Sequence, residues 1–134
     1  MPSARTVERS VVDTSVWVDF FRGKAPAVAL IHDLARAHAA VICGQIVQET
    51  IQGARTETEM EFLRAQMGLW HHEAEQPEDF HRAAGIYARL RWKGVNVPPA
   101  DCLIAAVALR RELPLLSSDA HFAQIPGLKF SHVK

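Results

Sequence analysis

Three short apolar segments, each followed at once by a helical pattern, restrict the fold of this chain more than any other feature. They begin at positions 10, 40 and 115, and each is only three or four residues long. Such runs are typical of strands buried on both faces. Strands that alternate with helices pair in parallel, with helices on both sides of the sheet. We therefore predict an α/β fold with three layers, α/β/α, around a short central parallel sheet, with a last strand near 128–131.

Six helices are predicted from apolar spacing, capping residues and glycine stops. They span 16–22, 26–37, 45–54, 56–69, 78–93 and 100–112. The last of them has no charged residue between Cys102 and Leu109, so we expect it at the centre of the core. The two helices within 56–93 carry no motif, and we expect them to form an extra helical hairpin.

The length of the chain, 134 residues, is typical of one domain. We predict a single domain over 1–134, with residues 1–9 as a polar lead-in to the first strand. No apolar run approaches the ~18 residues of a membrane span, and the first ten residues lack the apolar centre of a secretory signal. Cys43 and Cys102 are too few for a disulfide scaffold and are expected as buried thiols. These features favour a cytoplasmic protein with no membrane partner.

Four acidic residues occupy strand ends or helix starts. Asp13 and Asp119 end two predicted strands, Glu49 lies early in the helix after the second strand, and Asp101 lies in the first turn of the central helix. Ligands of open parallel sheets bind outside the carboxyl ends of the strands. We therefore expect the four side chains to meet at one edge of the sheet.

Carboxylates brought together in this way need a proton or a cation among them. Two of them ~4 Å apart repel by roughly 4 kcal/mol at an effective dielectric constant near 20. Oxygen ligands select Mg²⁺ or Mn²⁺, which polarise a phosphodiester and lower the pKa of a bound water. The pattern indicates hydrolysis of a phosphate ester. Neutralising Asp13 or Asp101 is expected to keep or raise the stability of the metal-free protein.

Each acid also has a simpler interpretation, which spacing alone leaves open. Asp13 and Asp119 can cap the helical turns that follow them. Asp101 can complement a helix dipole, and Glu49 can be a solvated helix residue.

The segments that contain these acids resemble the motifs of PIN-domain proteins, in particular the VapC-type toxins of bacterial toxin–antitoxin pairs. The segments are VDTSVWVD at 12–19, IVQETIQG at 46–53, PPADCLIAA at 98–106 and LLSSDAHF at 115–122. Ser117 stands where threonine is common, and the segment around Glu49 matches least closely. The resemblance extends from about 11 to 128.

This resemblance implies a function, partners and a set of site residues. VapC-type toxins are endoribonucleases that use Mg²⁺ or Mn²⁺, act on tRNA or rRNA and form homodimers. A cognate VapB-type antitoxin inhibits them, often through a basic side chain inserted among the acids. The catalytic and metal-binding residues implied here are Asp13, Glu49, Asp101 and Asp119, supported by Thr14, Ser15 and Ser117.

Two other functions are less consistent with the sequence. A haloacid-dehalogenase-like phosphatase needs a second aspartate two residues after the nucleophile, where this chain has Ser15. A non-catalytic binding module with the same fold has no need of all four acids. Among the remaining candidates, His71 and His72 are adjacent and do not face one ion. Asp19 is expected in a solvated or salt-bridged role, and His121 in a packing or capping role.

Basic residues offer a modest surface for nucleic acid. Fifteen Lys and Arg balance fifteen Asp and Glu, which excludes a globally basic coat. Setting aside the four site acids leaves fifteen basic against eleven acidic residues. Arg89, Arg91 and Lys93 at the end of one predicted helix, and Arg110 and Arg111 at the end of another, are candidate phosphate contacts.

Overall fold

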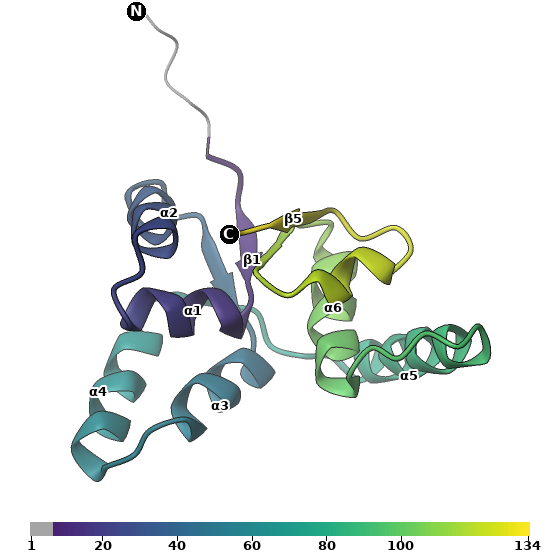
Figure 1. Cartoon of the computed structure of the whole chain (residues 1–134), viewed down its shortest axis with the longest axis horizontal. Coiled ribbons are helices and arrows are strands. Elements are labelled where there is room, and N and C mark those ends of the chain that lie inside the picture. The colour runs from purple at the N-terminus through teal and green to yellow at the C-terminus, as the bar shows by residue number, and fades with distance from the viewer. Residues whose placement is uncertain (1–6) are drawn as a thin grey trace, which may run out of the picture.

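One parallel sheet of five strands organises the protein, a computed structural model that describes residues 7–134 (Figure 1). The strand order is β3-β2-β1-β4-β5, and every neighbouring pair is parallel. The strands are β1 (Ser10–Val12), β2 (Ala40–Ile42), β3 (His71–His72), β4 (Leu115–Ser117) and β5 (Phe130–His132).

Helices cover both faces of this sheet, which confirms the three-layer prediction. Figure 1 shows α1 to α4 on one side of the strands and α5 and α6 on the other. The helices are α1 (Thr14–Phe21), α2 (Ala25–Arg36), α3 (Gly44–Gln52), α4 (Glu57–Met67), α5 (Pro77–Trp92) and α6 (Pro99–Arg111), with a short 3₁₀ helix η1 (Ala120–Gln124).

The core lies between the central strands and the helices on either side. The side chains of β1 and β2 are almost completely buried. On the other face, α6 buries Cys102 and the whole run 104–108, which confirms the prediction of a central apolar helix. Trp17 of α1 is fully buried, and its Nε1–H donates to the carbonyl of Val12 at 3.0 Å. This bond fixes α1 against the end of β1, directly beside Asp13.

The predicted hairpin between 56 and 93 is wrong. His71 and His72 form strand β3, which pairs with Val41 and Ile42 and separates α4 from α5. Consequently α4 packs against α3, whereas α5 packs against α6 on the opposite face. The two histidines are exposed and carry no apolar alternation, so the strand depends on backbone pairing with β2.

Two further expectations concern the chain outside the core. Residues 1–6 of the predicted lead-in lie outside the described residues, and residues 7–9 precede β1 without helix or strand. From residue 7 onward, none of the helices combines the length and the hydropathy that crossing a membrane requires.

Candidate active site

The order of the strands creates a crevice at the carboxyl end of the sheet. The chain passes from β1 outward to β2 and β3, then returns across the sheet to β4 and β5. The direction of winding therefore reverses between β1 and β4, and such a reversal leaves an opening between the loops that follow the two strands. Asp13 comes directly after β1, and Asp119 lies two residues beyond the end of β4.

Asp13 lies at this edge of the sheet and is almost fully buried. Its Oδ2 accepts hydrogen bonds from the hydroxyls of Ser15 at 2.8 Å and Ser117 at 2.7 Å, and a longer one from the backbone N–H of Ser15. Every hydrogen bond described for this carboxylate reaches Oδ2. The Oδ1 atom is therefore available to a ligand.

The two serines also tie the start of α1 to the end of β4. Their hydroxyl oxygens lie 3.1 Å apart. The backbone N–H of Ser118 donates to the Ser15 hydroxyl at 3.0 Å, and that of Asp119 donates to the Ser117 hydroxyl at 2.9 Å. Asp13 and Asp119, 106 positions apart in the chain, are thus connected through the side chain of Ser117.

Glu49 reaches the crevice from α3. The Thr14 hydroxyl donates to its Oε1 at 3.0 Å. Burial raises the pKa of Glu49 above its ordinary value and the nearby Asp13 charge adds to this rise, while the bond from Thr14 opposes it. Glu49 is therefore part of the same electrostatic cluster as Asp13.

Asp101 is the most strongly perturbed acid of the site. It lies in the first turn of α6, and burial together with the charges of Asp13, Asp119 and Glu49 raises its pKa to about 7. The charge of His121 acts in the opposite direction. Without a cation, this carboxyl holds its proton up to neutral pH.

Asp101, Asp119 and His121 each offer one ligand atom, and these atoms lie within 4.8 Å of one another. His121 Nδ1 is 2.9 Å from Asp119 Oδ1, which also accepts the backbone N–H of His121. This donor set, rich in oxygen and short of counter-charge, fits a hard divalent cation.

The structure brings all four predicted acids together, but only two of them lie at ligand distance from one another. Asp101 and Asp119 belong to the group at ligand distance, whereas Asp13 and Glu49 interact with it electrostatically. His121, expected in a packing or capping role, lies in this group as well; its position two residues after Asp119, in a turn, was the available signal. The capping of η1 by Asp119 and of α1 by Asp13 coexists with their place in the cluster.

Supporting contacts position the helices that carry these acids. Glu75, in the loop between β3 and α5, accepts the backbone N–H groups of Gly44 at 2.9 Å and Gln45 at 2.7 Å. It thereby caps α3, whose own N-cap residue, Cys43, makes no side-chain capping bond. A Cβ on Gly44 would lie 3.0 Å from the Glu75 carboxylate, so a larger residue here would make the carboxylate shift by a few tenths of an ångström.

The same loop is held by the end of α6. Arg110 contacts Asp79 at 2.9 Å and Glu73 at 3.2 Å and donates to the carbonyl of Ala74 at 3.0 Å. Arg111 pairs with Glu73 at 3.3 Å. Acidic residues of this chain thus already engage these two arginines, which makes them weaker candidates for phosphate contacts. Asp19 pairs with Lys24 at 3.3 Å, as expected for a salt-bridged residue.

Comparison with known proteins places this geometry in a family. The family model described as PIN domain matches residues 10–128. The chain is 37% identical over 119 residues to the protein named Ribonuclease VapC11 of Mycobacterium tuberculosis, covering 84% of this chain and 87% of that protein. It is 30% identical over 124 residues to Ribonuclease VapC19 of the same organism, covering 89% and 96%.

Solved structures share the fold at lower identity. A DNA-bound VapBC from Salmonella typhimurium aligns with a TM-score of 0.77 at 21% identity, covering 94% of this chain and 98% of that chain. VapBC2 from Rickettsia felis, bound to a promoter DNA fragment, aligns with a TM-score of 0.78 at 15% identity, covering 93% and 98%. The match over nearly the whole chain and the identity to VapC ribonucleases show that this chain belongs to the PIN-domain family.

Proposed function

We propose that this chain is a metal-dependent endoribonuclease of the VapC type, the toxin of a toxin–antitoxin pair, folded as one domain over 1–134. One observation carries the proposal: four acids from β1, α3, α6 and the turn after β4 gather where the winding of the sheet reverses. The relatives named ribonuclease support RNA as the substrate. We expect that RNA to be tRNA or rRNA.

The oxygen-rich cluster fits Mg²⁺ or Mn²⁺. Asp101, Asp119 and His121 would hold the ion, with Asp13 Oδ1 and Glu49 beside it. Bound there, the ion would neutralise charge on the phosphodiester and lower the pKa of the attacking water. Asp101 would release its proton on loading, because the repulsion that raises its pKa would then be compensated.

The chain's own residues hold these acids in place. Ser15 and Ser117 fix one oxygen of Asp13 and so orient the other, and Thr14 orients Glu49. Such preorganisation limits the rearrangement needed when charge develops on the substrate.

Partners follow from the same proposal. The VapBC complexes among the solved structures support a VapB-type antitoxin, whose basic side chain would compensate the acids. We also propose a homodimer that acts in the cytoplasm, where its RNA substrates are.

A dehalogenase-like phosphatase is a weaker candidate. Ser15 occupies the position at which that chemistry needs an acid, and its hydroxyl is already committed to Asp13 and to the N–H of Ser118.

The test is cleavage of structured RNA by the purified protein with Mn²⁺. We expect Asp13→Asn and Asp101→Asn each to abolish cleavage while the circular dichroism spectrum stays that of the folded protein. Asp33→Asn is the matched control, because Asp33 is exposed and, among residues 7–134, its side chain pairs only with Arg36 on its own helix. Undiminished cleavage by either site variant would remove that residue from the mechanism, and no cleavage by the unmodified protein would favour a binding module.

A further inference from the structure

The face of α3 that carries Glu49 is lined by glutamines. Gln45, Gln48, Glu49 and Gln52 are three or four positions apart and therefore share one side of the helix. The opposite side packs into the core through Ile46 and Thr50. The Gln45 side chain acts to lower the pKa of Glu49, so this face is continuous with the acidic cluster.

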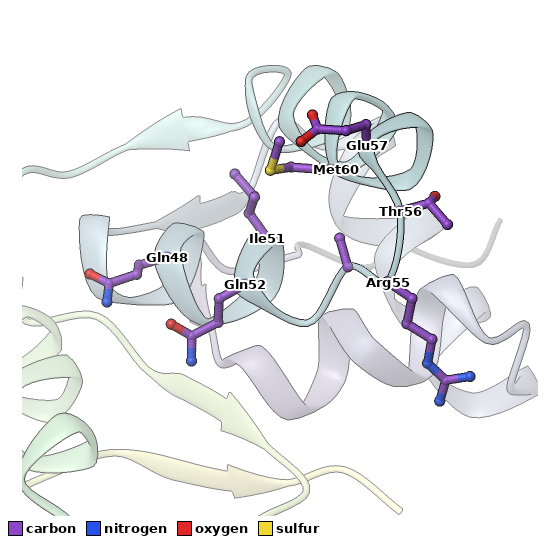
Figure 2. Close-up of a pocket in the computed structure, with 8 residues that line it drawn as sticks. Gln48, Ile51, Gln52, Arg55, Thr56, Glu57 and Met60 are labelled. Atoms are coloured by element: carbon purple, nitrogen blue, oxygen red, sulfur yellow. The ribbon is translucent and has the colours of Figure 1, made fainter.

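Beyond Glu49, this face borders an open cavity of about 600 Å³ between α3 and α4 (Figure 2). Figure 2 shows Gln48 and Gln52 extending from α3 on the side away from α4, and Arg55 extending from the connecting loop, at the rim of the cavity. Ile51 and Met60 provide apolar surface between the helices. The cavity thus combines amide groups, one guanidinium and an apolar wall.

The polar groups of this cavity are available to a ligand. Within residues 7–134, no hydrogen bond or ion pair is described for the side chains of Gln48, Gln52 or Arg55. The one carboxylate at the rim, that of Glu57, lies on the α4 side, away from Gln48 and Gln52 (Figure 2). The α3 side of the rim therefore offers donors, acceptors and a positive charge.

We propose that this cavity binds an unpaired nucleotide of the RNA substrate adjacent to the cleaved bond, with Gln48 and Gln52 reading its base and Arg55 holding its phosphate. A side-chain amide donates and accepts at once, which matches the edge of adenine. Unpaired bases are what sequence-selective proteins read in RNA, by edge hydrogen bonds and contact with the ring face. A guanidinium suits the phosphate of such a nucleotide.

Position along the helix explains why this nucleotide would neighbour the cleaved bond. Gln48 and Gln52 flank Glu49 on the same face, within one helical turn of it. A strand that presents a phosphate to the acidic cluster can therefore place the next base at the two amides. This inference rests on the proposed ribonuclease function and adds the residues that determine its specificity.

The experiment is cleavage of a randomised RNA pool with Mn²⁺, followed by sequencing of the new ends. For Gln48→Ala, Gln52→Ala and the double variant, we expect the preference for one base over the others, at one position beside the cleaved bond, to fall about tenfold. Gln66→Ala, on α4 outside the cavity, is the matched control and should keep the preference of the unmodified protein.

Arg55→Ala provides a second readout. We expect weaker RNA binding for all sequences and a salt dependence of binding reduced by about one unit of slope, as for loss of one phosphate contact. Arg64→Ala, exposed on α4, is its control.

The outcomes separate this inference from the proposed function. If the unmodified protein cleaves RNA and the glutamine variants keep its base preference, the inference is wrong and the ribonuclease function stands. If these variants instead lose only their affinity for a partner polypeptide, the cavity is a protein interface and the inference is again wrong. If the unmodified protein cleaves no RNA, the proposed function itself fails.

Discussion

At the scale of single residues, the acids of the site differ in how their negative charge is compensated. Asp13 accepts two serine hydroxyls and one backbone N–H, so its charge is compensated by hydrogen bonds. Asp101 is half-buried among three other acids, and its pKa is raised to about 7. The expectation that neutralising either residue keeps or raises stability therefore applies to Asp101, whereas Asp13→Asn would weaken charge-assisted bonds.

We predict that Asp101→Asn stabilises the metal-free protein at high pH but not at low pH. Well below pH 3.8, Asp101 is protonated in both the folded and the unfolded state. Between its ordinary value of 3.8 and its folded value of about 7, only the unfolded state loses the proton, so stability falls as pH rises. Asparagine cannot ionise and removes this loss.

Urea unfolding with a chelator present, at about pH 4 and about pH 8, measures this effect. The variant should gain much more free energy of unfolding relative to the unmodified protein at the higher pH than at the lower. An identical difference at both pH values would show that burial of Asp101 imposes no cost on its charge.

At the scale of secondary-structure elements, α3 depends on a cap supplied from far along the chain. Glu75 accepts two of the N–H groups that an α-helix leaves unpaired at its start, from 30 and 31 positions away. Arg110 of α6 holds the same loop. The loop between β3 and α5 therefore connects the helix that carries Glu49 to the helix that carries Asp101.

We predict that Glu75→Ala lowers the free energy of unfolding by about 0.5–2 kcal/mol, the usual cost of losing an N-cap. Glu75→Gln keeps one acceptor oxygen and should lose less. Glu78→Ala, exposed in the first turn of α5, is the control for loss of an acidic side chain in this region. Denaturant titration of the three variants measures the free energy of unfolding. Equal decreases for Glu75→Ala and Glu78→Ala would disprove the capping role.

At the scale of the whole molecule, the site brings together residues from the helices on the two faces of the sheet. Its acids come from both sides of the sheet, since α3 and α6 cover opposite faces. A cation bound among them would connect these layers only in the folded state. Binding energy of this kind adds directly to the stability of the fold.

We predict that Mn²⁺ raises the melting temperature of the protein. At a free concentration 100 times its dissociation constant, the gain would be about 2.7 kcal/mol. Differential scanning calorimetry of Asp101→Asn and Asp119→Asn should show a much smaller rise, and Asp33→Asn the full rise. An equal rise in all three variants would place the ion elsewhere on the protein.

The strands and helices that carry the site were largely predictable, because their signals are local. Asp13 and Asp119 follow short apolar runs, and α6 has an uncharged stretch that could only be buried. Strand β3 was not predictable, since two exposed histidines show no strand pattern and their partner lies 30 positions away in β2. Missing β3 produced the wrong hairpin, because an edge strand there directs α5 to the other face.

The sequence by itself determined which elements form and which of them end in acidic residues, because apolar spacing and helix capping act over a few positions. Only the tertiary structure decided that His121 lies beside Asp101 and Asp119, that Glu75 caps α3, and that Arg110 and Arg111 pair with acidic residues around the loop after β3. These contacts join distant positions whose approach depends on the order of strands in the sheet, which no local pattern encodes.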